Sequence, residues 1–221
     1  MKRRSPEEIS ASAREKILAQ LNSAQSNIDY PLLSDFTDEG DFVFPQPDNL
    51  LQTFCDELEE IKGRVIVADS EKEATEKLND LLAQKSINSL YCTDEYLLKK
   101  LNSKIPTESQ PEKFEDMEAA ITRCELLIAR SGTVVVSSAF SGRRLNVFPP
   151  IHIIWAEKKQ LVPFISDAIN RLKEKYGNDF PSQVTFVTGQ SRTADIEKTL
   201  VMGAHGPREL IVVINQEVKQ I

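Results

Sequence analysis

Short apolar runs alternate with amphipathic segments along most of the chain, from about residue 49 onward. Apolar residues recur at the three- and four-residue spacing of helices near residues 49–62, 70–83 and 94–101. The runs between these segments, RVIVA at 64–68 and SLYC at 89–92, have the length and composition of buried strands. This alternation predicts an α/β fold with a mixed, largely parallel sheet flanked by helices.

The second half of the chain continues the alternation beyond a proline-bearing loop at 103–116. In ELLIARSGTVVVSSA, at 125–139, Ser131 and Gly132 separate two apolar runs. This pattern predicts either two strands joined by a tight turn or one strand bent at a bulge. The other elements predicted by periodicity are a short helix near 116–123, a strand HIIWAE at 152–157, a helix at 160–179, a strand QVTFVTG at 183–189, a short helix TADIEKTLVM at 193–202 and a final strand ELIVVIN at 209–215.

The N-terminal part of the chain has a different pattern. Residues 5–22 carry apolar positions at helical spacing, with Ser5 as a candidate N-cap and Pro6 at the first helical position. The following segment has no sustained period and contains several prolines and acidic residues. We therefore expect an N-terminal helix and acidic arm at 1–47 and an α/β domain at 48–221.

Charge and cysteine positions exclude several classes of protein. A formal net charge of −7 argues against a nucleic-acid binder. No segment reaches the roughly 18 to 20 apolar residues of a membrane span, and the basic N-terminus turns acidic where a signal peptide would be apolar. Cys55, Cys92 and Cys124 match no zinc or iron–sulfur spacing, so we expect small buried side chains and no metal. These observations predict a cytoplasmic protein.

The loop GQSRTAD, at 189–195, is the first candidate binding site, because it follows a predicted strand. In open α/β sheets, ligands bind beyond the carboxyl ends of strands, where backbone N–H groups and helix N-termini point outward. Gly189 allows a close backbone approach, and Ser191, Arg192 and Thr193 supply donors suited to a carboxylate or phosphate. The loop thus predicts a site for a small anionic ligand.

Ordinary helix capping explains the same loop without a ligand. Serine and threonine are common N-caps, and Asp195 and Glu197 would complement the dipole of the predicted helix. The two acids would also compete with an anion for the positive end of that helix. Spacing alone leaves both interpretations open.

A second arginine loop, SSAFSGRRLN, follows the predicted strand TVVVSSA. Arg143 and Arg144 form a local positive cluster on an acidic chain, which favours an anionic ligand. The alternative is a pair of solvated surface arginines beside a glycine turn. Convergence of the two arginine loops on one crevice would favour a shared site.

The two histidines and the glycines give no catalytic or cofactor signature. His205, in GAHGP, is a candidate acid or base, but no Ser, Cys or Asp beside it completes a triad, which favours a loop histidine anchored by backbone hydrogen bonds. His152, inside a predicted strand, is expected to be a buried, hydrogen-bonded structural residue. The chain contains no dinucleotide, nucleoside-triphosphate or esterase fingerprint, so no bound cofactor is expected.

Four motifs resemble one known family, the lactate utilisation protein C family, whose common unit is the LUD domain. They are the strand bearing SGT at 131–133, PPIHI at 149–153, GQSRTADIE at 189–197 and GAHGP at 203–207. The resemblance is specific over about 115–215 and extends more weakly to about residue 48. One departure concerns Arg130 and Ser131, which stand where the family usually has an acidic residue and threonine.

The resemblance carries its own expectations. It implies the superfold of ribose-phosphate isomerases, glucosamine-phosphate deaminases and CoA-transferases. It also implies a part in oxidising L-lactate to pyruvate with iron–sulfur partner proteins, in a subunit without cluster cysteines. Under this hypothesis Ser191, Arg192 and Thr193 hold an anion, His205 lines the same crevice and Asp195 orients the loop.

Two other functions remain open. The chain could be a stand-alone enzyme acting on a carboxylate, CoA ester or sugar phosphate, with Asp195, Glu197 or His205 as the catalytic group. It could also be a non-catalytic subunit that docks a partner. The sequence leaves the oligomeric state open, including a homo-oligomer.

Overall fold

The computed structural model of the chain describes residues 14–20, 45–88, 90–101, 105–109, 117–145, 148–196, 199–202 and 206–217. The chain divides into two units, Met1–Pro45 and Gln46–Ile221. In the first unit residues 14–20 are helical, within the helix predicted at 5–22. The rest of that helix and most of the acidic arm lie outside the described residues. Both sheets described below belong to the second unit.

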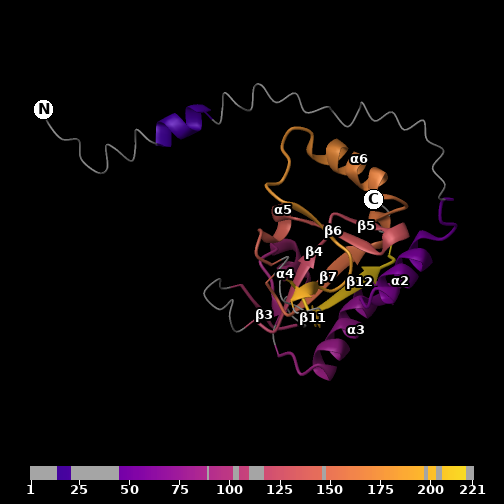
Figure 1. The fold of residues 1–221 in the computed structure, drawn as a ribbon. Coiled ribbons are helices and arrows are strands. Elements are labelled where there is room, and N and C mark those ends of the chain that lie inside the picture. Colours follow the sequence, from indigo (N-terminus) through magenta and orange to yellow (C-terminus); the bar gives the residue numbers. More distant parts are fainter. Residues whose placement is uncertain are drawn as a thin grey trace, which may run out of the picture. The chain divides into compact units, whose positions relative to one another are not determined.

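The central sheet consists of six strands: β1 (Arg64–Ala68), β2 (Leu90–Tyr91), β3 (Thr107–Glu108), β4 (Ala119–Arg123), β7 (Ile151–Glu157) and β12 (Glu209–Asn215). Their order is β1-β12-β7-β4-β2-β3, and every neighbouring pair is parallel (Figure 1). Nearly all residues of β4, β7 and β12 are buried, as expected for parallel strands covered on both faces. The carboxyl ends of all six strands therefore lie along one edge.

Helices α3 (Glu71–Gln84) and α4 (Glu95–Leu101) cover one face of this sheet. Buried leucines of the helices, among them Leu78 and Leu97, pack with Trp155 of β7 and Val213 of β12. The Ser70 side chain caps the start of α3 by accepting the N–H of Glu73. These contacts follow from the helical spacing of the leucines in the sequence.

The other face of the central sheet packs against α2 (Leu50–Glu60) and a second sheet. The second sheet contains β5 (Leu126–Ile128), β6 (Thr133–Ser137), β8 (Leu161–Val162) and β9 (Val184–Val187), in the order β8-β5-β6-β9. Phe54 and Leu58 of α2 pack in one core with Val134 of β6 and Val212 of β12. Helix α6 (Ile165–Tyr176) closes the other side of the second sheet.

Most predicted elements of the second unit are confirmed. Helices α2, α3 and α4 and strands β1, β2, β7, β9 and β12 lie in the predicted segments. The two runs around Ser131 and Gly132 form the antiparallel strands β5 and β6, joined by the 3-10 turn Ala129–Ser131. Gly132 has a φ of 57°, a left-handed conformation that glycine adopts readily. The tight turn, not the bulge, is therefore the arrangement adopted.

Two predicted helices are wrong. The segment near 116–123 contains β4, because Ala119 and Ala120 lie in a fully buried strand where burial outweighs their helix propensity. Residues of the predicted helix 193–202 form instead the antiparallel hairpin β10 (Arg192–Ile196) and β11 (Thr199–Met202). Thr193 pairs with Val201 in this hairpin, and such β-branched residues favour strands.

The helix predicted at 160–179 begins later than expected. Leu161 and Val162 form β8 and pair with β5, so the chain turns helical only from Ile165. Pro163, which directly follows β8, lacks the N–H that a helix interior needs. The end of α6 is as predicted, with Gly177 as its C-cap.

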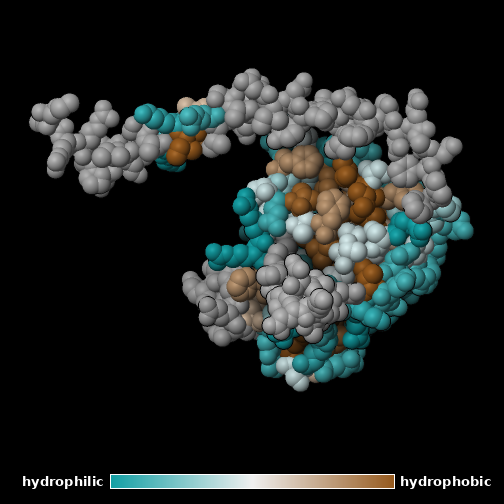
Figure 2. Space-filling model, in the orientation of Figure 1, coloured by the Kyte–Doolittle hydropathy of each residue, from teal (hydrophilic) through white to brown (hydrophobic). Residues whose placement is uncertain are grey.

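Apolar atoms gather on one face of the second unit, between α6 and β12 in the view of Figure 2. The exposed apolar side chains of residues 165–186 are Ile165, Phe180 and Phe186, and Phe186 lies on the edge strand β9.

Among the described helices, none combines the length and apolar character needed to cross a membrane.

Candidate functional site

The loop at 188–191 lies against the segments that lead into β1 and β12. The N–H of Ser191 donates to the carbonyl of Pro207, just before β12, over 2.9 Å. Gly189 packs so closely on Ile61, just before β1, that an added Cβ would lie 2.9 Å from the Ile61 carbonyl oxygen. The loop therefore follows the carboxyl end of β9 but lies at the amino ends of the parallel strands.

Hydroxyl groups connect this loop to the SGT turn. Thr133 Oγ1 lies 2.8 Å from Thr188 Oγ1 and 2.7 Å from Ser131 Oγ. A Cβ added to Gly206 would lie 3.1 Å from the Cβ of Ser191, so Gly206 and Pro207 lie against the loop at 188–191. We call residues 131–133, 188–191 and 206–207 the motif corner.

The motif corner is packed tightly on α2. A Cβ added to Gly132 would lie 2.5 Å from the backbone nitrogen of Leu58 and 2.7 Å from the Leu58 Cα atom. Gly189 has a φ of 76° in addition to its contact with Ile61. Close packing and backbone conformation thus require these glycines, whether or not a ligand binds nearby.

The structure gives the other predicted loop residues only in part. Arg192, Thr193 and Asp195 lie in β10, and their side chains lie outside the described residues. Glu197 and His205 lie outside the described residues altogether. No helix begins at Arg192 in the described chain, so neither the expected helix N-terminus nor the capping alternative applies to this loop.

The second arginine loop lies at the opposite end of the β6–β9 pair. Val134 pairs with Val187 and Ser137 with Val184, and Arg143 donates through Nε to Ser182 Oγ at 3.2 Å. Three residues of strand separate the two ends by about 10 Å. Arg143 and Arg144, which follow the short helix α5 (Ser138–Ser141), therefore do not join the motif corner.

His152 is the buried structural residue that its position predicted. Its Nε2 atom lies 2.8 Å from Thr122 Oγ1, and burial lowers the pKa of the imidazole to about 4. Its Nδ1 atom has no hydrogen-bond partner among the described residues. The ring is thus neutral at neutral pH and too deeply buried to meet a substrate.

The cysteines show no feature of a redox or metal site. Cys92 and Cys124 are buried, Cys55 is partly buried, and burial raises the pKa of the Cys55 and Cys92 thiols to about 11. Within the described ranges, no group of three histidine, cysteine or acidic side chains is placed to hold a metal ion.

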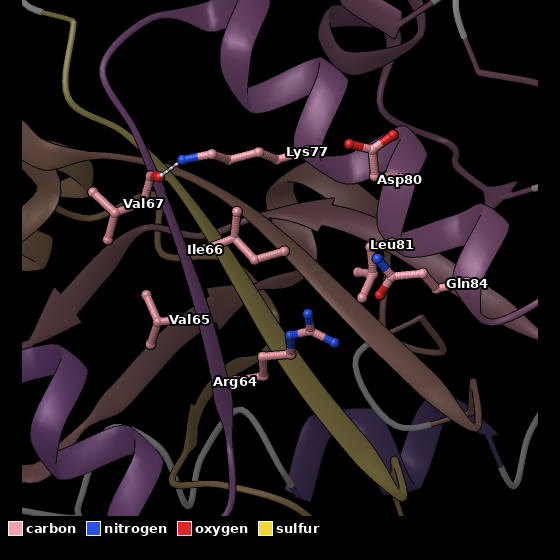
Figure 3. Close-up of a pocket in the computed structure, with 8 residues that line it drawn as sticks. All are labelled: Arg64, Val65, Ile66, Val67, Lys77, Asp80, Leu81 and Gln84. Atoms are coloured by element: carbon pink, nitrogen blue, oxygen red, sulfur yellow. Dashed lines mark hydrogen bonds between the residues drawn. The ribbon is translucent and has the colours of Figure 1, made fainter.

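A hollow beside the edge strand β1 is shown in Figure 3. Val65, Ile66 and Val67 line it from β1, and Lys77 reaches across from α3 to donate to the Val67 carbonyl over 2.7 Å. Lys77 also pairs with Glu73 at 2.7 Å. The lysine therefore occupies an edge carbonyl that could otherwise pair with another strand.

A second hollow, of about 400 Å³, lies at the carboxyl ends of β4 and β7. We call it the carboxyl-edge crevice. Its lining is rich in charged and aromatic side chains: Tyr96, Arg123, Cys124, Glu125, Phe140, Trp155, Glu157, Lys159, Gln160 and Lys175. Sequence reasoning missed these residues because β4 was predicted to be a helix, so Arg123 was not placed at the end of a strand.

Comparison with known proteins relates the second unit to one family. The model of the LUD domain family matches residues 51–214. The chain is 35% identical over 131 residues to lactate utilization protein C of Bacillus subtilis, covering 52% of this chain and 55% of that protein. It is 35% identical over 109 residues to the protein of the same name from Bacillus licheniformis, covering 48% and 45%. The chain thus spans about half the length of the curated relatives it matches.

One solved structure has a similar fold. It is a DUF162 family protein from Deinococcus radiodurans, with a TM-score of 0.55 and 19% sequence identity. The similarity covers 75% of this chain and 96% of that one. At this identity it supports the α/β fold and carries no functional conclusion.

Proposed function

Because the chain belongs to the LUD domain family, we propose that it is a subunit of an L-lactate utilisation system, acting in the oxidation of L-lactate to pyruvate. Relatives named lactate utilization protein C, at about 35% identity, support this assignment. We further propose iron–sulfur proteins as its partners, as the resemblance to the lactate utilisation protein C family implies. The superfold of ribose-phosphate isomerases and CoA-transferases is part of the same proposal.

The observation that carries the proposal is the convergence of the family motifs at one corner. Three segments far apart in the sequence meet there through the bond between Thr133 and Thr188 and the bond from Ser191 to Pro207. The guanidinium of Arg192 and the hydroxyl groups of Ser191 and Thr193 follow directly on this corner, and such donors suit a small anion. We propose that Gly189, Ser191, Arg192 and Thr193 hold a carboxylate of the substrate or product there.

The remaining candidates keep the roles that the sequence suggests for them. We propose that His205 lines the same site and that Asp195 orients Arg192, while Glu197 and Asp195 are the candidate bases or nucleophiles if the chain is itself an enzyme. Arg143 and Arg144 belong to the other end of the second sheet and have no part in this site.

Growth on L-lactate tests the proposal. A strain lacking the gene should grow normally on glucose and poorly on L-lactate as carbon source, and the wild-type gene should restore growth. Arg192→Ala should fail to restore it, whereas Arg171→Ala, an exposed arginine of α6, should restore it fully. Undiminished growth of the deletion strain on L-lactate would refute the proposed function.

A further inference from the structure

The carboxyl-edge crevice occupies the position where open parallel sheets bind ligands. Arg123 ends β4 and Glu157 ends β7, the two neighbouring strands at the middle of the sheet. Ligands of α/β sheets collect beyond such carboxyl ends, where side chains of several elements converge. Here α4, α5 and α6 contribute Tyr96, Phe140 and Lys175.

Arg123 is held rigidly at the crevice with part of its guanidinium unused. Its Nε donates to Asp94 Oδ2 over 2.7 Å, and its Cζ lies 4.6 Å and 4.3 Å from the ring centres of Tyr96 and Phe140. Its Nη groups make no hydrogen bond to any described residue, and its side chain is 30% exposed. A fixed guanidinium with free Nη donors is suited to a carboxylate or phosphate.

Lys175 supplies a second cation beside the same ring. Its Nζ lies 4.8 Å from the Phe140 ring centre and 2.6 Å from Glu125 Oε2. Burial lowers the pKa of Lys175, but hydrogen bonds to Glu125 and Tyr176 outweigh burial and raise it above its usual value. The side chain is half-exposed, so the ammonium retains donors that face solvent.

The acids of the crevice are already engaged. Glu125, whose side chain is 1% exposed, accepts hydrogen bonds from Ser137, Lys175 and Tyr176. Glu157 pairs with Lys159 at 2.6 Å. The acids therefore position the cations, and each ion pair offsets part of the negative charge that an incoming anion would meet.

Trp155 gives the crevice an apolar wall and an unused donor. The indole is buried, and its N–H has no hydrogen-bond partner among the described residues. Tyr96 and Phe140 add aromatic surface. A volume of about 400 Å³ exceeds the need of a three-carbon acid and lies in the range of pockets for larger organic ligands.

We propose that the carboxyl-edge crevice binds an organic oxyanion larger than lactate, with its carboxylate or phosphate on Arg123 and Lys175 and its apolar body against Tyr96, Phe140 and Trp155. This site is separate from the motif corner, which lies at the amino ends of the same parallel strands. Its occupant is therefore a second ligand, and the crevice can be tested without reference to lactate.

The fluorescence of Trp155, the chain's single tryptophan, reports directly on this crevice. The full chain is titrated with benzoate, phenyl phosphate and the neutral benzyl alcohol, and calorimetry checks each affinity. Benzoate or phenyl phosphate should change the fluorescence saturably, and the tighter of the two identifies the preferred oxyanion. Benzyl alcohol should bind at least about tenfold more weakly, because it lacks the charge-assisted hydrogen bonds.

Charge-removing variants complete the test. Arg123→Met and Lys175→Met should each weaken the oxyanion about tenfold or more, while Lys158→Met, outside the crevice lining, should not. Lys175→Met serves if Arg123→Met, which strips Asp94 of its partner, does not fold. Saturable binding of neither anion, equal binding of benzyl alcohol, or unchanged affinity in both variants would overturn the proposal. None of these outcomes bears on growth on L-lactate.

Discussion

The side-chain oxygens of Thr133 and Thr188 lie 2.8 Å apart and join the SGT turn to the GQS loop across 55 positions of sequence. Thr188→Val should remove this bond and leave the buried Thr133 hydroxyl with fewer partners. We expect the free energy of unfolding to fall by about 1 to 2 kcal/mol, measured by urea denaturation. Thr185→Val in β9 should cost less, because its bond with Gln183 joins residues only two positions apart and links no separate segments. Equal losses in the two variants would contradict a special role for the link.

Gly132 is predicted to be the least replaceable glycine of the motif corner. In Gly132→Ala the new Cβ would lie 2.5 Å from the Leu58 nitrogen, so α2 would have to move. Gly177→Ala is the matched control, since that glycine also has a positive φ but no atom within 4 Å of the added Cβ. We expect about 1 to 3 kcal/mol of backbone strain in the control and a clearly larger loss in Gly132→Ala. Thermal unfolding of both variants measures the two losses of stability. Similar losses would show that α2 can move to accommodate the new Cβ at little cost.

Lys77 is predicted to keep the edge strand β1 from pairing with other chains. Its removal in Lys77→Met frees the Val67 carbonyl and exposes an apolar edge. We expect concentration-dependent association in sedimentation velocity. Lys72→Met removes the same charge from the same helix, but Lys72 pairs with Glu76 and not with β1. This variant should sediment as the wild type does. Association of both variants to the same degree would assign the effect to net charge.

The buried His152 makes stability depend on pH. Its pKa is lowered from 6.5 to about 4 by burial, so the unfolded chain takes up a proton in this range before the folded chain does. The folded state has its full stability above about pH 6.5, the histidine pKa of the unfolded chain. It loses stability as the pH falls toward about 4, the pKa of His152 in the folded chain. Between about pH 7 and pH 5 the loss should be about 2 kcal/mol.

The variant His152→Gln isolates this contribution. Glutamine can still hydrogen-bond to Thr122 but does not titrate. Urea denaturation at several pH values should therefore show a shallower decline in the variant than in the wild type. Parallel declines would mean that other groups cause the acid sensitivity.

The sequence predicted the α/β architecture because buried strands and amphipathic helices differ in period. It did not predict β4, since Ala119 and Ala120 suit a helix until burial on both faces is known. Nor did it predict the hairpin of β10 and β11, because Ala194, Asp195 and Glu197 mask the β-branched pattern of their neighbours. In β4, tertiary context thus overrides local propensity.

The site was harder to predict than the fold for a related reason. Which loops meet depends on strand direction and register, and the pairing of β6 with β9 sends Arg143 and the motif corner to opposite ends. The crevice was missed because its residues come from six separate elements and β4 was predicted to be a helix. Had β4 been predicted as a strand, Arg123 would stand at its carboxyl end, where open α/β sheets bind ligands.

We propose that this chain is required for oxidising L-lactate, and pyruvate formation in a cell extract measures that requirement. An extract of lactate-grown cells lacking the gene is supplied with L-lactate, and pyruvate is measured with and without the purified full chain. We expect little pyruvate without the chain, restoration by the wild-type chain and no restoration by Arg192→Ala. Equal pyruvate formation in the extract without the chain would contradict it.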